Sequence, residues 1–236
     1  MAIQRITSRE ILDDDSVSPE DLPIILNDLW RINRWCGGVS GSLRLLKRFF
    51  ARTGRRTARI LDVGAGDGRL ASALSQRLKK QNVETKFFAL DRQFSHLRGN
   101  HFPRQGLTRI VGDALHLPFR PASFDIVMSN LFLHHFSGES AKELIRAMTA
   151  VASEAVLIND LDRRWLPYLL IRHAPLLTRN PISRLDGIAS VRQAYTRREL
   201  VSLAGKAGTA AEVTFEVTRL PFFRHGLILW KTPVAV

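Results

Sequence analysis

The amino-acid sequence predicts an α/β protein in which a mostly parallel, seven-stranded sheet ends in an antiparallel hairpin. Short apolar runs alternate with helical stretches from residue 58 onward, which is the pattern of βαβ units. A glycine-rich turn joins the first apolar run to the next helix, as in Rossmann-like sheets. Two further apolar runs near the end of the sequence are close enough to pair. A chain of 236 residues can bury one substantial core, so we expect one domain.

The composition is that of a globular protein, with 45% apolar and 24% charged residues. The single cysteine, Cys36, excludes an intrachain disulfide and offers no metal-ligand spacing, so we expect a reducing compartment and no bound metal. The N-terminal sequence lacks the apolar core of a signal peptide, and no run approaches the roughly 18 apolar residues of a membrane span. We therefore expect a cytoplasmic protein.

The net charge is +13, from 35 basic and 22 acidic residues, and such a charge favours anionic partners. Basic residues are concentrated at positions 44–59, where no acidic residue interrupts them. Such a segment forms either a solvated face or a patch that binds nucleic acid, a membrane surface or an acidic ligand. The composition does not choose between these two interpretations.

Residues 1–57 are predicted to form a helical N-terminal cap on the sheet. Apolar residues recur at three- and four-residue spacing over residues 22–35, which predicts an amphipathic helix. Gly37 and Gly38 are expected to end that helix. A second helix is expected over Ser42–Arg52, directly before the sheet begins.

Residues 58–236 are predicted to form the α/β domain itself. Five apolar runs are expected to be buried strands: Arg59–Val63, Lys86–Leu90, Thr108–Val111, Phe124–Met128 and Ala155–Ile158. Three helices are expected between them: Arg69–Lys79, Phe94–Asn100 and Glu139–Val151.

The pattern breaks after the fifth strand, where residues 161–195 read as an insertion made of an apolar helix and then a loop containing proline and glycine. A last helix is expected over Thr196–Ala207, because Thr196 and Glu199 have the spacing of a capping box. The two closing runs, expected to pair as a hairpin, are Ala211–Thr218 and Phe223–Lys231.

The turn after the first strand carries the strongest signal of function. Its glycines have the spacing GxGxG and let a ligand approach the backbone closely: Gly64, Gly66 and Gly68. Arg69 stands where a dinucleotide-binding turn has glycine or alanine. Asp62 and Asp67 place carboxylates beside the turn, which oppose a pyrophosphate and suit a ligand with a cationic amino group and a sulfonium.

In this form, with Ala65 between the first two glycines, the segment resembles the first motif of class I S-adenosylmethionine (SAM) dependent methyltransferases. The resemblance extends in order and spacing over residues 58–160 and implies SAM as the cofactor. The methyltransferases that this segment resembles include enzymes that act on small molecules, among them quinone precursors and polyketides.

The resemblance also assigns cofactor-binding residues after the second and third strands. Asp91, which is followed by Arg92, would accept hydrogen bonds from the two ribose hydroxyls. Asp113 would meet the adenine amino group, and Ala114 and Leu115 would lie against the adenine ring. At the end of the fourth strand, the residues expected beside the methionine part of SAM are Ser129 and Asn130.

Methyl transfer from a sulfonium is an in-line displacement that depends mainly on positioning. A general base helps when the acceptor is a hydroxyl, and His134 and His135 follow the fourth strand where the site should lie. Asp160, after the fifth strand, is expected to orient an acceptor hydroxyl. His173 and His225 are weaker candidates for a base.

The resemblance favours a small-molecule acceptor, such as the hydroxyl of a phenolic, polyketide-like or quinone-like compound that can be lipophilic. Peripheral membrane contact of the basic face would be compatible with such an acceptor. The cap and insertion are expected to set the specificity for the acceptor, since the residues of the motifs bind the cofactor. The oligomeric state is left open.

Two other functions stay open. An rRNA or tRNA methyltransferase would suit the positive charge, but residues 129–132 lack the prolyl-aromatic motif of many base-modifying enzymes. A catalytically inactive protein of the same fold could serve as a binding subunit.

Overall fold

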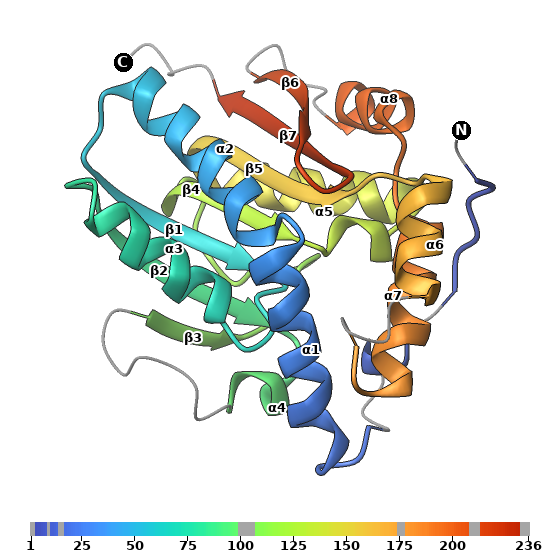
Figure 1. Cartoon of the computed structure of the whole chain (residues 1–236). Coiled ribbons are helices and arrows are strands. Elements are labelled where there is room, and N and C mark those ends of the chain that lie inside the picture. Colours follow the sequence, from blue (N-terminus) through green and yellow to red (C-terminus); the bar gives the residue numbers. More distant parts are fainter. Residues whose placement is uncertain are drawn as a thin grey trace.

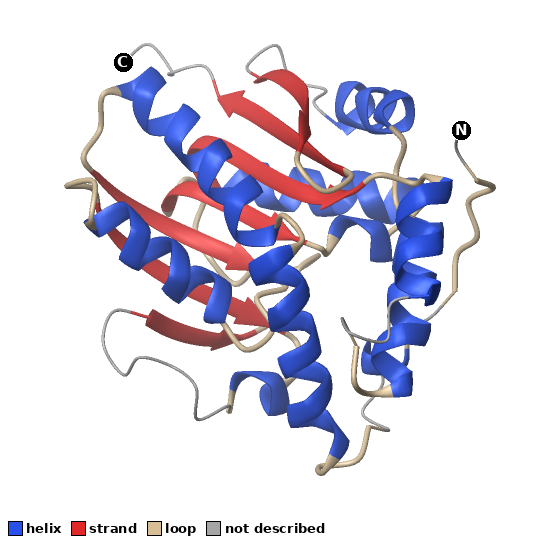
Figure 2. Cartoon of the chain, in the orientation of Figure 1, coloured by secondary structure: helices blue, strands red, loops and turns tan. Residues whose placement is uncertain are grey.

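The computed structural model of the chain describes residues 3–8, 10–13, 17–98, 107–173, 178–207 and 213–231. A seven-stranded sheet lies at its centre, with helices on both faces (Figures 1 and 2). The strands are β1 (Thr57–Val63), β2 (Glu84–Asp91), β3 (Leu107–Val111), β4 (Phe124–Asn130), β5 (Ala152–Leu161), β6 (Val213–Leu220) and β7 (Arg224–Lys231). The α-helices are α1 (Asp21–Trp35), α2 (Gly38–Thr53), α3 (Arg69–Lys79), α4 (Phe94–Leu97), α5 (Gly138–Val151), α6 (Trp165–His173), α7 (Pro181–Gln193) and α8 (Arg197–Ala207).

The strand order is β3-β2-β1-β4-β5-β7-β6. The first five strands are parallel, and β7 pairs antiparallel with both β5 and β6, which confirms the predicted fold class. The order reverses between β1 and β4, and open sheets of this kind bind ligands at the carboxyl ends of the strands beside such a reversal.

Two apolar cores cover the two faces of the sheet. Alternate residues of β1 enter different cores, since Ile60 belongs to one cluster and Leu61 to the other. Phe49 of α2 and Leu74 of α3 pack with Ile60, whereas Met148 of α5 lies on the other side with Leu61. The helix α2 is therefore part of the main core and not an appendage.

The two cap helices were predicted correctly, but their junction was not. Gly37 adopts a left-handed φ of 86° and caps the start of α2. Gly38 is the first residue of α2 instead of a terminator of α1. A side chain at Gly37 would also meet the carbonyl oxygen of Pro221 at 2.8 Å, so glycine is needed there.

The insertion contains a second helix where a loop was expected. Asn180 accepts the backbone N–H of Ile182, and Pro181 occupies the first turn, so α7 starts with strong helix-start signals. The predicted capping box is confirmed, since the Glu199 carboxylate accepts the N–H of Thr196 at 2.8 Å. The first residues of the predicted strand 211–218 and the end of the predicted helix 94–100 lie outside the described residues.

Much of the basic segment is paired within the molecule. Arg48 binds Glu216 at 2.5 Å, and Arg55 binds both Asp125 and Glu154. The guanidinium of Arg52 lies 4.3 Å from the centre of the Trp230 ring. These contacts favour the solvated-face interpretation, and binding of an anionic partner by the rest of the segment stays a prediction. None of the described helices combines the length and apolar character of a membrane span.

Candidate active site

A cavity of about 570 Å³ opens at the carboxyl ends of β1, β2 and β4. The cap helix α1, the insertion helices α6 and α7, and the N-terminal segment of residues 10–13 form its other walls. This volume lies within the roughly 300–1,000 Å³ of ordinary ligand pockets. Eleven of the predicted cofactor-binding and catalytic positions on the glycine turn and the strand ends line it: Asp62, Gly64, Ala65, Gly66, Asp67, Asp91, Arg92, Asp113, Ala114, Leu115 and Asn130. His134 and His135 line it as well.

The glycine turn is fixed by its conformation and by an aromatic neighbour. Gly64 has a φ of 70°, and a side chain there would approach Cδ2 of Phe132 to 2.4 Å. Gly66 is also left-handed, with open space where a side chain would be. Gly68 begins α3 as its left-handed N-cap and does not line the cavity, so its role is to start the helix.

Asp62 is a buried carboxyl group on the cavity wall, and one of its oxygens makes no hydrogen bond. Its Oδ2 has no hydrogen-bond partner, and the side chain is 1% exposed. Burial, together with the charge of Asp91, raises the pKa of Asp62 to about 7. A cationic ligand group would supply the missing partner, so this residue fits the amino group of SAM.

Asp67 does not supply the second free carboxylate that the sequence predicted. Its side chain forms an ion pair with Arg69, which also donates to the carbonyl of Leu26 and to Asn27 on α1. The guanidinium of Arg69 therefore neutralises the loop and ties the cap to it. The sequence marked Arg69 only as a departure from dinucleotide-binding turns.

Asp91 and Asp113 stand at the ends of neighbouring strands. One oxygen of Asp91 accepts the N–H of Gly66 at 2.8 Å, and the other accepts the N–H of Gln93 at 2.9 Å. These bonds hold the carboxylate in place, and each oxygen keeps an acceptor position. The N–H of Leu115 binds Asp113 and lowers the pKa of that carboxyl group.

The end of β4 places one of its two predicted residues at the cavity. Asn130 lines it, donates to Asn33 of α1 at 2.7 Å and accepts from Arg224 at 3.2 Å. Ser129 is fully buried beneath the wall, so the expected direct contact with the cofactor is not supported. The buried Arg224 was not predicted, because β7 approaches this site only through the fold.

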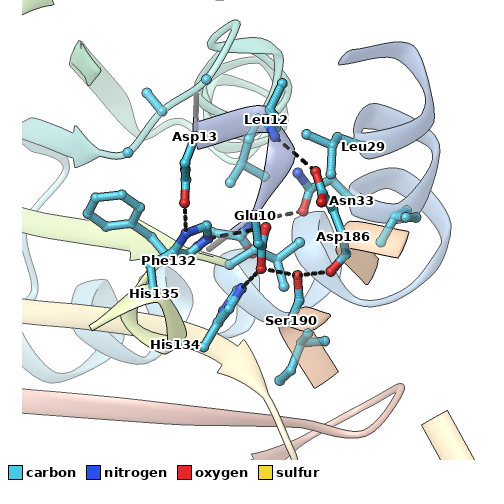
Figure 3. Close-up of a pocket in the computed structure, with 18 of the residues that line it drawn as sticks. Glu10, Leu12, Asp13, Leu29, Asn33, Phe132, His134, His135, Asp186 and Ser190 are labelled. Carbon is cyan, nitrogen blue, oxygen red and sulfur yellow. Dashed lines mark hydrogen bonds and ion pairs between the residues drawn. The ribbon is translucent and has the colours of Figure 1, made fainter. Parts of the chain in front are cut away.

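His134 is enclosed by two carboxylates. Its Nδ1 donates to Asp160 at 2.7 Å. Its Nε2 lies 3.5 Å from Glu10 (Figure 3). Burial alone would lower the pKa of His134, but Asp160 and Glu10 outweigh burial and raise it to about 10. A protonated imidazole does not fit the predicted role of general base at neutral pH.

Asp160 lies behind His134 and not on the cavity wall. It also accepts the backbone N–H of His134 at 3.0 Å, and His134 lowers the pKa of Asp160 against the effect of burial. This geometry does not support the prediction that Asp160 orients an acceptor hydroxyl, because its oxygens position the histidine. The other two candidate bases also lie off the cavity, since His225 binds Asp162 at 3.1 Å and His173 is exposed.

His135 faces the cavity beside His134. Its Nδ1 lies 2.7 Å from Asp13, and its Nε2 lies 3.7 Å from Glu10 (Figure 3). Burial would raise the pKa of Glu10, yet the two histidines hold it below its usual value. The same balance, led by the bond to His135, lowers the pKa of Asp13.

The N-terminal segment reaches this site because α7 binds it. Asp186 accepts the backbone N–H groups of Ile11 and Leu12 at 2.9 and 3.0 Å. Ser190 donates to Glu10 at 2.6 Å. The segment lies along α6 and α7 in Figure 1, and its residues 10–13 share the cavity wall with α1.

Sequence reasoning missed this half of the site. Glu10, Asp13, Asp186 and Ser190 belong to no motif, and their partners are more than 100 residues away along the chain. The tryptophans of the cap and insertion lie in different places: Trp30 lines the cavity, while Trp35 and Trp165 are exposed.

Comparison with known proteins shows methyltransferase folds. Residues 60–154 match the family model of a methyltransferase domain, and no curated protein sequence matches the chain. A SAM-dependent methyltransferase from Aquifex aeolicus is 16% identical, with a TM-score of 0.62 over 92% of this chain and 100% of that chain.

Two plantazolicin methyltransferases of known structure are also similar to this chain in fold. BpumL, in complex with a monoazolic desmethylPZN analogue and S-adenosylhomocysteine (SAH), is 14% identical, with a TM-score of 0.68 over 91% of each chain. BamL, in complex with a triazolic analogue and SAH, is 13% identical, with a TM-score of 0.65 over 89% of each chain. At these identities the likeness is one of fold.

Proposed function

Residues 60–154 are a methyltransferase domain within a chain of the class I SAM-dependent methyltransferase fold, and from this premise we propose that the protein methylates a small-molecule acceptor. SAM, when bound, supplies a methyl group on a sulfonium and leaves as SAH. The proposal rests on one cavity that is lined both by the SAM-motif residues and by a second group of polar residues.

The observation that carries the proposal is the unpaired Oδ2 of Asp62 on the cavity wall. An orphaned buried carboxylate oxygen is costly, and the ammonium of an amino-acid moiety would satisfy it. Asp91 and Asp113 stand at the two strand ends that a ribose and an adenine would reach from there. The carboxylate of Asp62 would instead repel the negative charge of a pyrophosphate.

The acceptor is proposed to enter between α1, α7 and the two histidines. Leu29, Phe132 and Ile171 give this part of the cavity an apolar wall, while His135 and Glu10 give it a polar end. An apolar ring with one hydroxyl has this division of surface, so we propose a phenolic, polyketide-like or quinone-like acceptor. The plantazolicin methyltransferases, which have the same fold, are also natural-product enzymes.

Calorimetric titration with SAH tests the cofactor assignment. Wild-type protein is expected to bind SAH and not NAD, and Asp91→Ala is expected to lose SAH binding. Asp125→Ala is the matched control. That carboxylate accepts the N–H of Arg59 at the amino ends of the strands, away from the cavity. Preference for NAD, or equal SAH affinity in Asp91→Ala, would sink the proposal.

Methyl transfer is then followed with labelled SAM against phenolic, quinone-like and rRNA acceptors. A product from a phenolic or quinone-like compound supports the proposed acceptor class. Transfer to rRNA alone would replace it with the nucleic-acid function that the net charge of +13 kept open.

A further inference from the structure

Three potential metal ligands converge at the acceptor end of the cavity. Glu10, His134 and His135 each place one ligand atom within 4.8 Å of the ligand atoms of the other two. Nε2 of His134 lies 3.5 Å and Nε2 of His135 lies 3.7 Å from the Glu10 carboxylate. The first distance is to Oε1 and the second to Oε2 of Glu10, and both are close to the separation of ligands that share one ion at about 2.0–2.2 Å.

Each histidine is oriented by a carboxylate on its other nitrogen. Nδ1 of His134 binds Asp160 at 2.7 Å, and Nδ1 of His135 binds Asp13 at 2.7 Å. This arrangement directs both Nε2 atoms toward Glu10, as Figure 3 shows. Carboxylates that bind the second nitrogen of a ligating histidine are the usual outer support of metal sites.

The inner atoms of the cluster are poorly satisfied without a ligand. Nε2 of His134 is buried and has no hydrogen-bond partner, although the residue is only 1% exposed. Glu10 is itself fixed, since its Oε1 accepts from Ser190 at 2.6 Å and from Gln193 at 3.2 Å. The cluster is therefore a built site in which the one contact at Nε2 of His134 is its 3.5 Å ion pair with Glu10, and a metal ion would take the place of the proton between them.

We propose that Glu10, His134 and His135 bind a divalent transition-metal ion on the acceptor side of the cavity. Two imidazoles and one carboxylate suit Zn²⁺ or Fe²⁺ better than Mg²⁺, which prefers oxygen ligands and water. Three protein ligands leave a coordination position open to the cavity, as in catalytic metal sites.

The ion would hold the acceptor oxygen as its anion, with the hydroxyl proton released to solvent, while the C–S bond of the sulfonium breaks and the O–CH3 bond forms to leave SAH; this role rests on the proposed function. Metal binding itself does not rest on it. The sequence predicted no metal, because Glu10 lies far along the chain from the two histidines and no spacing signals the set.

Zn²⁺ and Co²⁺ are the probes for this site. Protein stripped with a chelator is titrated with Zn²⁺ by calorimetry, and Co²⁺ is followed by its visible absorption, which reports the ligand set. Wild type is expected to take up one ion per chain. Glu10→Gln and His135→Ala are expected to weaken binding by more than the roughly 10- to 100-fold that loss of an outer partner costs.

Asp13→Asn tests the outer carboxylate and is expected to weaken Zn²⁺ binding by roughly 10- to 100-fold. His173→Ala removes an exposed histidine outside the cluster and is expected to leave it unchanged. SAH titration of every variant checks the fold and separates this inference from the proposed function. Wild type that binds SAH but takes up no Zn²⁺, or binds Zn²⁺ no better than Glu10→Gln, would overturn the metal site and leave the methyltransferase proposal standing.

Discussion

Three aspartates at strand ends show how surroundings assign different states to one residue type. Asp62 has an unpaired oxygen and a pKa raised to about 7. Asp160, equally buried, has its pKa lowered because His134 donates to it. Asp91 is held by two backbone N–H groups. A buried carboxyl group without donors is the one that gains most from a cationic ligand.

The raised pKa of Asp62 predicts a pH-dependent affinity for SAH. The folded protein favours the protonated acid, so folding stability falls as pH rises from near 4 to about 7. A ligand ammonium needs the ionised form, so SAH affinity is expected to be about tenfold lower at pH 6 than at pH 8. Calorimetry over this range measures it.

Asp62→Asn is the matching variant for that prediction. It keeps the size of the side chain and removes the titrating group, so its SAH affinity should be lower at pH 8 and nearly independent of pH. An unchanged slope in the variant would assign the pH dependence to another group.

Gly64→Ala should damage the cofactor site by a steric route. The new Cβ would overlap Phe132 at 2.4 Å in a left-handed backbone, so we expect a loss of about 3 kcal/mol or more in unfolding free energy. Gly54→Ala is the control, since its φ is 69° with nothing within 4 Å, and it should cost about 1 kcal/mol. Denaturant unfolding measures both, and equal losses would contradict the role of Phe132.

The cofactor residues could be predicted because their signals are local. The strand, the glycines and Asp62 fall within a dozen positions, and the position of Asp91 follows from the next apolar run. Glu10 and Asp13 could not be predicted, because only the folded insertion brings them to the two histidines. Asp160 was predicted at the correct end of its strand. The direction of its side chain depends on hydrogen bonds to His134, which no sequence pattern reveals.

At the scale of elements, α7 shows why a loop was expected in place of a helix. Its buried positions include Ser183, Asp186 and Gln193, so it has no apolar stripe. The polar face is buried because it binds the N-terminal segment by hydrogen bonds. The remaining helix signal was the pair Asn180-Pro181, a side-chain cap followed by proline in the first turn.

Asp186→Ala is expected to release the N-terminal segment. The N–H groups of Ile11 and Leu12 would lose their acceptor, which costs roughly 1–3 kcal/mol of local stability. Hydrogen exchange of these two amides should then be roughly tenfold faster or more. Glu139→Ala, which removes an exposed ion pair on α5, should leave their exchange unchanged. Equal protection in both variants would mean that other contacts hold the segment.

At the scale of the whole molecule, the cavity joins parts of the chain that the sheet alone does not connect. Arg69 ties α1 to the glycine turn, and Arg224 reaches Asn130 from β7. Arg163 donates to the carbonyl of Ile3 and binds Glu199 on α8. The cavity is thus lined by segments from residue 10 to residue 224, which these arginines tie to one another.

This coupling predicts that SAH stabilises the molecule as a unit. At a free concentration of 100 times its Kd, SAH should add about 2.7 kcal/mol to the unfolding free energy, which raises Tm by roughly 5–10 °C. Hydrogen exchange should slow in α7 and at Ile11 and Leu12, which bind Asp186 on the far wall, as well as in the glycine turn. Protection confined to the turn would mean that α7 and the N-terminal segment open independently of the cofactor half of the cavity.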